Sequence, residues 1–164
     1  MRNDESRPAA RPIVLTGPSG SGRGAVAGLI RARSSSVRVP AAVTTRAPRP
    51  GERPGAEREF VTAARFDALL AAGELLAPAT IGPDRYAISR AALRRAGGHP
   101  LLIPLDPAGA RQVRHELPRS VLVLLVPRAG DESALTGLNP DVVMLCESVE
   151  RVAAELLGLL GSSF

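Results

Sequence analysis

A glycine-rich segment near the N-terminus constrains the fold of this chain more than any other feature. The segment is Gly17-Pro-Ser-Gly-Ser-Gly-Arg-Gly24, and it directly follows the apolar run Ile13–Thr16. A strand, a glycine-rich turn and a helix in this order are typical of a phosphate-binding loop, because the glycines let backbone N–H groups converge on phosphate oxygens. We therefore expect a phosphate-binding loop formed by Gly17, Ser19, Gly20, Ser21, Gly22 and Arg23.

Two residues depart from the pattern G-x-x-x-x-G-K-[ST] of such loops. Arg23 stands at the lysine position, and Gly24 stands at the position of the serine or threonine. Arginine keeps the positive charge but replaces a slim point charge with a planar fork. Glycine has no hydroxyl and cannot ligate a metal ion. The alternative is a glycine- and serine-rich turn that arises by chance and binds no phosphate.

Apolar runs and helical periodicities alternate along the rest of the chain. This alternation predicts an α/β fold, in which helices flank a parallel sheet. A proline-rich stretch at 40–54 interrupts the rhythm, and no strand is assigned to it. The expected strands are 13–16, 60–61, 74–76, 86–88, 101–105, 121–126 and 142–145, and the expected helices are 23–33, 63–72, 89–96, 108–115 and 149–160.

Three segments in a fixed order resemble guanylate kinase. They are Gly17-Pro-Ser-Gly-Ser-Gly22, Thr44-Thr-Arg-Ala-Pro-Arg-Pro-Gly-Glu52 and Leu105-Asp-Pro-Ala-Gly-Ala-Arg-Gln-Val113. The resemblance covers roughly residues 12–126 and resumes in the last helix. It implies a P-loop NTPase-type domain at 12–164 behind a flexible tail at 1–11. It also implies a small inserted lobe at 41–90 that binds the acceptor monophosphate, and a shortened lid connection at 127–141.

The resemblance also assigns the acceptor site, residue by residue. Arg46 and Arg49 match the two arginines that hold the acceptor phosphate, and Tyr86 matches one of two tyrosines. Arg58 stands at the other tyrosine position, where it adds a phosphate donor. Asp106 keeps a base-binding position of the family. Tyr86 can equally be a packing residue, and Asp106 can equally cap the helix that follows it.

Other family positions have lost their polar side chains. The guanine-reading positions hold Ala42, Ala77 and Ile88, and Pro104 falls on an acidic position near the magnesium. The lid connection carries a single basic residue, Arg128. In the family the lid supplies arginines to the transferred phosphoryl group, and such arginines contribute about 10³ to 10⁵ in rate. These losses predict a catalytically impaired protein.

Three functions therefore follow from the sequence. The first is an impaired guanylate kinase-like protein whose former GMP-phosphate site binds a phosphate-bearing ligand, either a nucleotide or a phosphoprotein. The alternative is an active kinase that transfers phosphate from ATP to GMP with magnesium, and Arg23 is then its catalytic candidate. The second alternative is an interaction module that binds no nucleotide. No side-chain set at metal-ligand spacing is evident, so we expect no protein-bound metal.

Composition excludes several other classes. The 164 residues suffice for one domain, and all 21 basic residues are arginine. The net charge of +5 suggests a nucleic-acid surface, but no basic run is interleaved with aromatic residues, so nucleic-acid binding is not expected. The lone Cys146 fits a reducing compartment, and the longest apolar run, 121–126, is far too short to span a membrane. We expect a cytoplasmic protein with no membrane partner, and its oligomeric state stays open.

Overall fold

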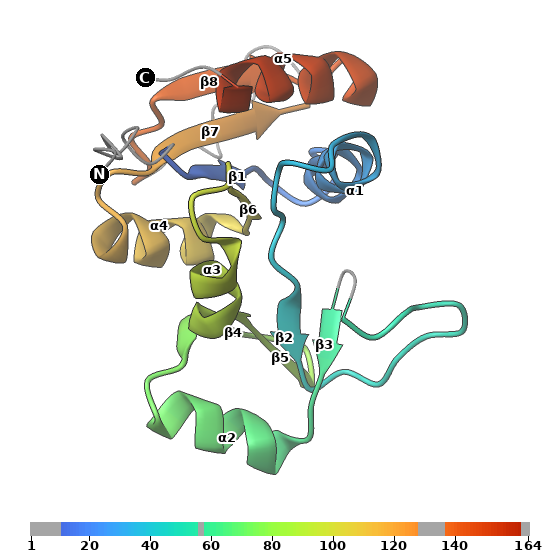
Figure 1. The fold of residues 1–164 in the computed structure, drawn as a ribbon, viewed down its shortest axis with the longest axis vertical. Coiled ribbons are helices and arrows are strands. Elements are labelled where there is room, and N and C mark those ends of the chain that lie inside the picture. The colour runs from blue at the N-terminus through green and yellow to red at the C-terminus, as the bar shows by residue number, and fades with distance from the viewer. Residues whose placement is uncertain (1–10, 56–57, 128–136, 162–164) are drawn as a thin grey trace, which may run out of the picture.

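The computed structural model describes residues 11–55, 58–127 and 137–161. In this part of the chain, a core built on one parallel sheet carries a smaller lobe built on a second sheet (Figure 1). The core sheet has the strand order β6-β1-β7-β8, and every neighbouring pair is parallel. Its strands are β1 (Ile13–Thr16), β6 (Leu102–Pro104), β7 (Val121–Val126) and β8 (Val142–Leu145).

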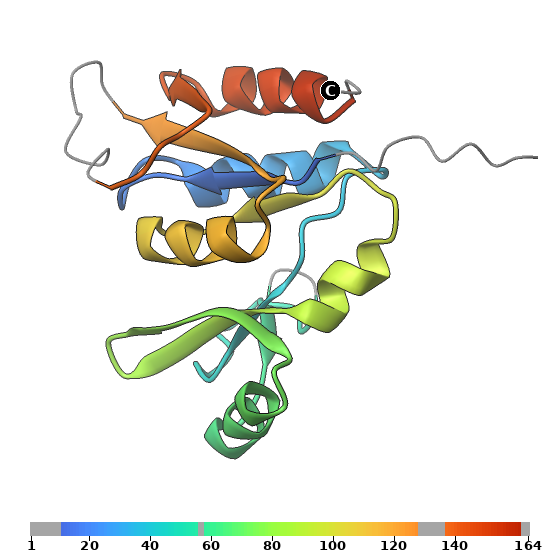
Figure 2. The ribbon, with the colours of Figure 1, turned by 90° about the vertical axis from the view of Figure 1, so that its left-hand side faces the viewer.

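Helices cover both faces of the core sheet, as the side-chain alternation of its strands requires. Ile13 and Leu15 of β1 pack on one face with α1 (Arg23–Arg33) and α5 (Val149–Gly161). Val14 points to the opposite face, where α4 (Pro107–Glu116) packs (Figure 2). Because both faces are covered, β1 and β7 are buried along their whole length and read as continuous apolar runs. The parallel α/β fold predicted from the sequence is confirmed.

The lobe is a mixed sheet with the strand order β3-β2-β5-β4. Helix α2 packs on one face of this sheet through the fully buried Phe66, which contacts Val43 and Ala87. Helix α3 leads from the lobe back to the core (Figure 2). The elements of the lobe are β2 (Ala42–Thr44), β3 (Arg58–Phe60), α2 (Ala63–Ala71), β4 (Leu75–Ile81), β5 (Asp84–Ser89) and α3 (Arg90–Ala96).

Sequence patterns indicated some of the strands of this second sheet but not all of them. The proline-rich stretch contains β2, to which the sequence assigned no strand, because three residues between prolines are too short for a period-2 pattern to show. The strand expected at 60–61 lies at Arg58–Phe60. The extended segments expected at 74–76 and 86–88 are the ends of a longer hairpin, β4–β5, whose polar and alanine-rich middle hid its length.

A bulge distorts β4 where it faces the core. The register between β4 and β5 shifts between Leu76 and Ala79, so two residues of β4 lie opposite Ala87 alone. Ala77 has a φ of 52°, the left-handed conformation that costs an L-residue about 1–2 kcal/mol. Such strain persists only where the surroundings fix it, and it is common beside binding sites.

Side chains cap the helices that border the lobe. Thr62, Ser89 and Asp106 each accept a hydrogen bond from the backbone N–H group three residues further on, at the start of α2, α3 and α4. The cap at Asp106 is one of the two roles that the sequence analysis gives this residue. Within the described ranges, no helix has the length and apolar character needed to cross a membrane.

Candidate functional site

The glycine-rich loop joins β1 to α1 and is held close to the core sheet. A Cβ atom on Gly17 would lie 2.6 Å from the carbonyl oxygen of Leu125, so no larger residue fits without moving the backbone of β7. Gly22 has a φ of 90° and precedes the first residue of α1. The first turn of a helix leaves backbone N–H groups without intrahelical partners, and these groups bind anions. The loop therefore has the backbone geometry of a phosphate site.

Two buried hydroxyl groups at this loop lack hydrogen-bond partners. Thr16 ends β1 and is fully buried, and Ser21 lies in the loop with 3% of its surface exposed. Within the described part of the chain, neither Oγ1 of Thr16 nor Oγ of Ser21 has a hydrogen-bond partner. Buried hydroxyls are nearly always paired in folded proteins, so these two groups indicate a site that is completed by a bound molecule.

Arg23 does not extend freely from the loop toward an anion. Its Nη1 atom donates to the carbonyl oxygens of Gly17 at 2.8 Å and Leu105 at 2.9 Å. The guanidinium thereby ties the glycine-rich loop to the connection between β6 and α4. Burial lowers the pKa of Arg23, and the nearby carboxylate of Asp106 partly offsets that effect. Arg23 is thus a structural tie, while its side chain still lines the neighbouring cavity.

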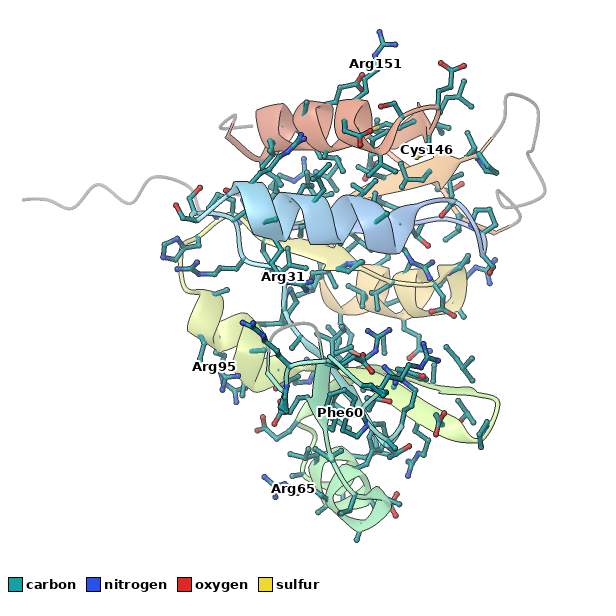
Figure 3. All side chains as sticks on the ribbon, turned by 90° about the vertical axis from the view of Figure 1, so that its right-hand side faces the viewer. Arg31, Phe60, Arg65, Arg95, Cys146 and Arg151 are labelled. Carbon is teal, nitrogen blue, oxygen red and sulfur yellow. The ribbon has the colours of Figure 1, made fainter. Side chains whose placement is uncertain are left out.

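A cavity of about 500 Å³ lies between α1, the lobe sheet and the connection from β6 to α4. Helix α1 contributes Arg23, Gly24, Ala27 and Arg31, three of which lie at a spacing of four residues on one helix face. Figure 3 places Arg31 on the side of α1 that faces the lobe. Sequence reasoning missed Arg31, although its spacing from Arg23 was the signal that could have identified it.

Arg58 and Tyr86 reach the same cavity from the lobe sheet. Arg58 pairs with Ala42, and Tyr86 pairs with Thr44, so both side chains lie on the sheet face that borders the cavity. The Nε atom of Arg58 is buried and has no hydrogen-bond partner among the residues that the structure describes. A buried, unpaired guanidinium N–H beside a phenol is a strong donor for a phosphate oxygen. These two expected acceptor residues are therefore placed together with Arg23 and Asp106.

Arg46 and Arg49 occupy different positions from Arg58. Arg46 forms a bidentate ion pair with Glu52, at 2.9 Å and 2.8 Å, and its guanidinium stacks 5.6 Å from the centre of the Phe60 ring. The side chain of Arg49 is exposed, and its backbone N–H donates to Glu52 at 2.6 Å. Neither arginine lines the cavity.

Tyr86 connects Arg46 to the cavity. The hydrogen bonds that Arg46 donates to Glu52 raise the pKa of Arg46 most, and Tyr86 adds to that effect, so the phenol lies beside this guanidinium. Tyr86 itself lines the cavity. Tyr86 thus lies between Arg46 and the cavity, and the carboxylate of Glu52 neutralises the charge of Arg46.

Asp106 caps a helix and also lines the cavity. Its Oδ1 atom accepts a hydrogen bond from the backbone N–H of Gly109 at 2.9 Å and caps α4, which is the capping role expected from the sequence. The same side chain lines the cavity. The remaining carboxylate oxygen is the acidic group that this wall offers to a ligand.

The loop residues fit the phosphates of a nucleotide but do not fit a protein-bound magnesium ion. Gly24 offers no hydroxyl, and Pro104 lines the cavity where the family resemblance places an acid. Among the described residues, no group of three or more acidic, cysteine or histidine side chains could hold a metal ion. The expected lid connection, 127–141, lies mostly outside the described residues, as does Arg128.

We expect Gly17→Ala to destabilise the protein by about 1–3 kcal/mol, because the added Cβ would overpack the loop against the Leu125 carbonyl. Thermal unfolding of the variant measures this loss. Gly28→Ala is the matched control, since a Cβ there meets no atom within 4 Å and removes a helix-interior glycine. An unfolding temperature of Gly17→Ala equal to wild type would contradict the tight packing of the loop.

The Arg46–Glu52 ion pair gives a pH prediction. The hydrogen bonds from Arg46, and then the backbone N–H of Arg49, hold the pKa of Glu52 at about 2, below its usual 4.5. Stability from this pair is therefore complete above pH 4.5 and is lost as the pH falls through 2. We expect Glu52→Gln to be less stable than wild type near neutral pH, with a difference that shrinks below pH 4.5. Thermal unfolding across this range measures it, and a pH-independent difference would contradict the assignment.

Comparison with known proteins agrees with this geometry. The sequence profile described as "Guanylate kinase" matches residues 9–137. The guanylate kinase of Thermobifida fusca is 37% identical, with 98% of this chain and 94% of that protein aligned. The guanylate kinase of Streptomyces coelicolor is 38% identical over 93% of this chain and 92% of that protein. The crystal structure of guanylate kinase from Anaplasma phagocytophilum shares the fold, with a TM-score of 0.75 at 23% identity, over 93% of this chain and 85% of that one. The chain therefore belongs to the guanylate kinase family.

Proposed function

We propose that this protein binds the phosphates of ATP at its glycine-rich loop and a nucleoside monophosphate in the adjoining cavity, and that it transfers phosphate slowly from ATP to GMP. One observation carries the proposal. A single cavity is lined both by the start of α1, with Arg23 and Gly24, and by Arg58 and Tyr86 of the lobe. Two phosphate sites on one cavity are what in-line transfer requires, because positioning supplies much of the rate in phosphoryl transfer.

The names of the relatives support transfer over binding alone. Proteins 37% and 38% identical over nearly the whole chain are described as guanylate kinases. The glycines that the loop geometry requires are also kept. Gly17 has no room for a Cβ atom, and Gly22 has a φ of 90°, a conformation that favours glycine.

Arg23 and Gly24 are the reasons for a slow reaction. The Nη1 atom of Arg23 is engaged by two backbone carbonyls, so its charge is less available to a transferred phosphate. Removal of one preorganised donor from a transition state costs about 10² to 10³ in rate. Gly24 adds no metal-binding hydroxyl. We therefore expect turnover at least about a hundredfold slower than in a relative with lysine and serine at these positions.

A second candidate is binding without transfer, in which the cavity holds a phosphorylated ligand or phosphoprotein. The tie between Arg23 and the carbonyls of Gly17 and Leu105 favours it, because a guanidinium used for structure contributes little to catalysis. The buried and unpaired Nε of Arg58 serves this candidate as well as the first one.

A coupled assay of ADP formation, run with ATP and magnesium in the presence and absence of GMP, separates the candidates. GMP-dependent ADP formation that is lost in Arg58→Ala supports slow transfer. Calorimetric binding of GMP with no ADP above the no-enzyme background supports binding alone. Absence of any calorimetric signal with GMP, ATP or inorganic phosphate would contradict both candidates and leave an interaction module without nucleotide.

A further inference from the structure

The wall of the cavity changes in character across the lobe sheet. Register pairs Arg58 of β3 with Ala42 of β2, and Ala42 with Ile88 of β5. The cationic side chain therefore lies at the β3 edge, and small apolar side chains follow toward β4. When the phosphate of a nucleoside monophosphate binds at Arg58, its sugar and base lie along this apolar strip.

The apolar strip continues onto the bulge of β4. Ala77 and Ala79 line the cavity there, on either side of the register shift. The φ of 52° at Ala77 turns the backbone of β4 at the cavity wall. Ala77 is 4% exposed and packs in the core cluster with Leu76 and Ile88, so Ala79 and Ile81 supply the accessible carbon of this part of the strip.

Hydrogen-bonding groups are scarce along the rest of the lining. Among the lining residues that the structure describes, Asp106 is the one with a carboxylate. It lies in the connection from β6 to α4 and not on the lobe sheet; its Oδ1 atom accepts from the N–H of Gly109, and its other oxygen is the one carboxylate acceptor left for a ligand. Pro40 and Pro104 also line the cavity and have no backbone N–H to donate. The strip therefore presents neither a carboxylate nor a hydroxyl to a base.

Guanine has a strongly polar edge, with an N1–H and an amino group that both donate hydrogen bonds. A site selects such an edge only when it offers matching acceptors, and an apolar wall leaves the donors unpaired. Adenine presents fewer donors on the corresponding edge. A cavity of about 500 Å³ has the size of a typical small-molecule site and does not separate the two purines by volume.

We propose that the acceptor cavity does not select guanine and takes purine nucleoside monophosphates as a class, with AMP bound at least as tightly as GMP. This inference rests on the proposed function, because it assumes that a monophosphate enters the cavity. Affinity comes from the phosphate at Arg58 and Tyr86 and from burial of the purine against Ala42 and Ala79.

Calorimetry of the wild-type protein with GMP, AMP, IMP and guanosine tests the inference without any variant. The expected result is a dissociation constant for AMP equal to or below that for GMP, and no measurable binding of guanosine. A preference for GMP of more than about fivefold over AMP would overturn the inference and leave the proposed function intact. Failure of every monophosphate to bind would overturn both.

A gain-of-selectivity variant adds an independent test. Ala79→Glu places a carboxylate on the strip, because Ala79 pairs with Tyr86 on the sheet face that borders the cavity, and we expect GMP to become preferred over AMP by about tenfold or more. Ala42→Ser is the second variant, because its hydroxyl lies on the same sheet face and outside the bulge of β4. We expect the ratio of GMP affinity to AMP affinity to rise by a few fold. Unchanged GMP-to-AMP ratios in folded forms of both variants would place the base elsewhere and overturn the inference.

Discussion

Arg58→Ala is expected to weaken GMP binding by about 10- to 100-fold, because hydrogen bonds to a charged partner contribute about 1.5–3 kcal/mol each. The Nε atom of Arg58 is buried at the cavity wall without a partner, so its hydrogen-bonding capacity is available to a ligand. Calorimetric titration with GMP and with inorganic phosphate measures the loss. Both ligands are expected to lose affinity together, since the arginine binds the phosphate and not the base.

Arg65→Ala is the matched control for this loss. Arg65 is an exposed arginine of α2 on the far side of the lobe, as Figure 3 shows. Its removal changes the net charge by the same amount and is expected to leave GMP affinity within about twofold of wild type, since exposed charges far from a site are screened. Equal affinities of Arg58→Ala and wild type would place the phosphate outside the cavity.

The double variant Arg23→Lys with Gly24→Ser is expected to raise GMP-dependent turnover by about a hundredfold, the effect of restoring one preorganised charge at the transferred phosphate. Lysine replaces the guanidinium, whose Nη1 atom contacts the carbonyls of Gly17 and Leu105, with a compact point charge on a flexible stem, and we expect its ammonium to reach a phosphate. The serine has room, because a Cβ on Gly24 meets no atom within 4 Å. Steady-state ADP formation measures the gain.

Arg23→Lys with Gly24→Ala is the control that separates the hydroxyl from the added methyl group. It is expected to show part of the gain, from the lysine alone. Loss of the arginine tie is also expected to lower stability by about 1–2 kcal/mol in both variants, the contribution of one or two hydrogen bonds. Turnover of the serine variant equal to wild type would contradict the view that positions 23 and 24 limit the rate.

The core could be predicted from the sequence because its signals are local. The buried strands β1 and β7 are continuous apolar runs, and the helices α1, α3 and α5 lie within one or two residues of their predicted bounds. Strand β2 was missed because its three residues are a strand only through pairing with β3 and β5, which lie far along the chain. Long-range pairing of this kind leaves no local pattern.

The candidate site was predicted only where its residues act through the backbone or through sheet register. Glycine spacing indicated the loop at 17–22, and the residue-by-residue resemblance to guanylate kinase indicated Arg58 and Tyr86. The pairing of Arg46 with Glu52 and the contacts of Arg23 with two carbonyls depend on side-chain directions, which spacing does not determine. The strained φ of Ala77 is likewise a product of the bulge and has no sequence signature.

Transfer of a labelled γ-phosphate from ATP to GMP tests most directly whether the glycine-rich loop and the lobe cavity form one reaction site. The protein is incubated with labelled ATP, magnesium and GMP, and the nucleotides are separated by chromatography over many hours. Labelled GDP that accumulates with wild type and disappears with Arg58→Ala is the predicted result. Label that remains in ATP, or appears only as inorganic phosphate, while GMP is bound would contradict it.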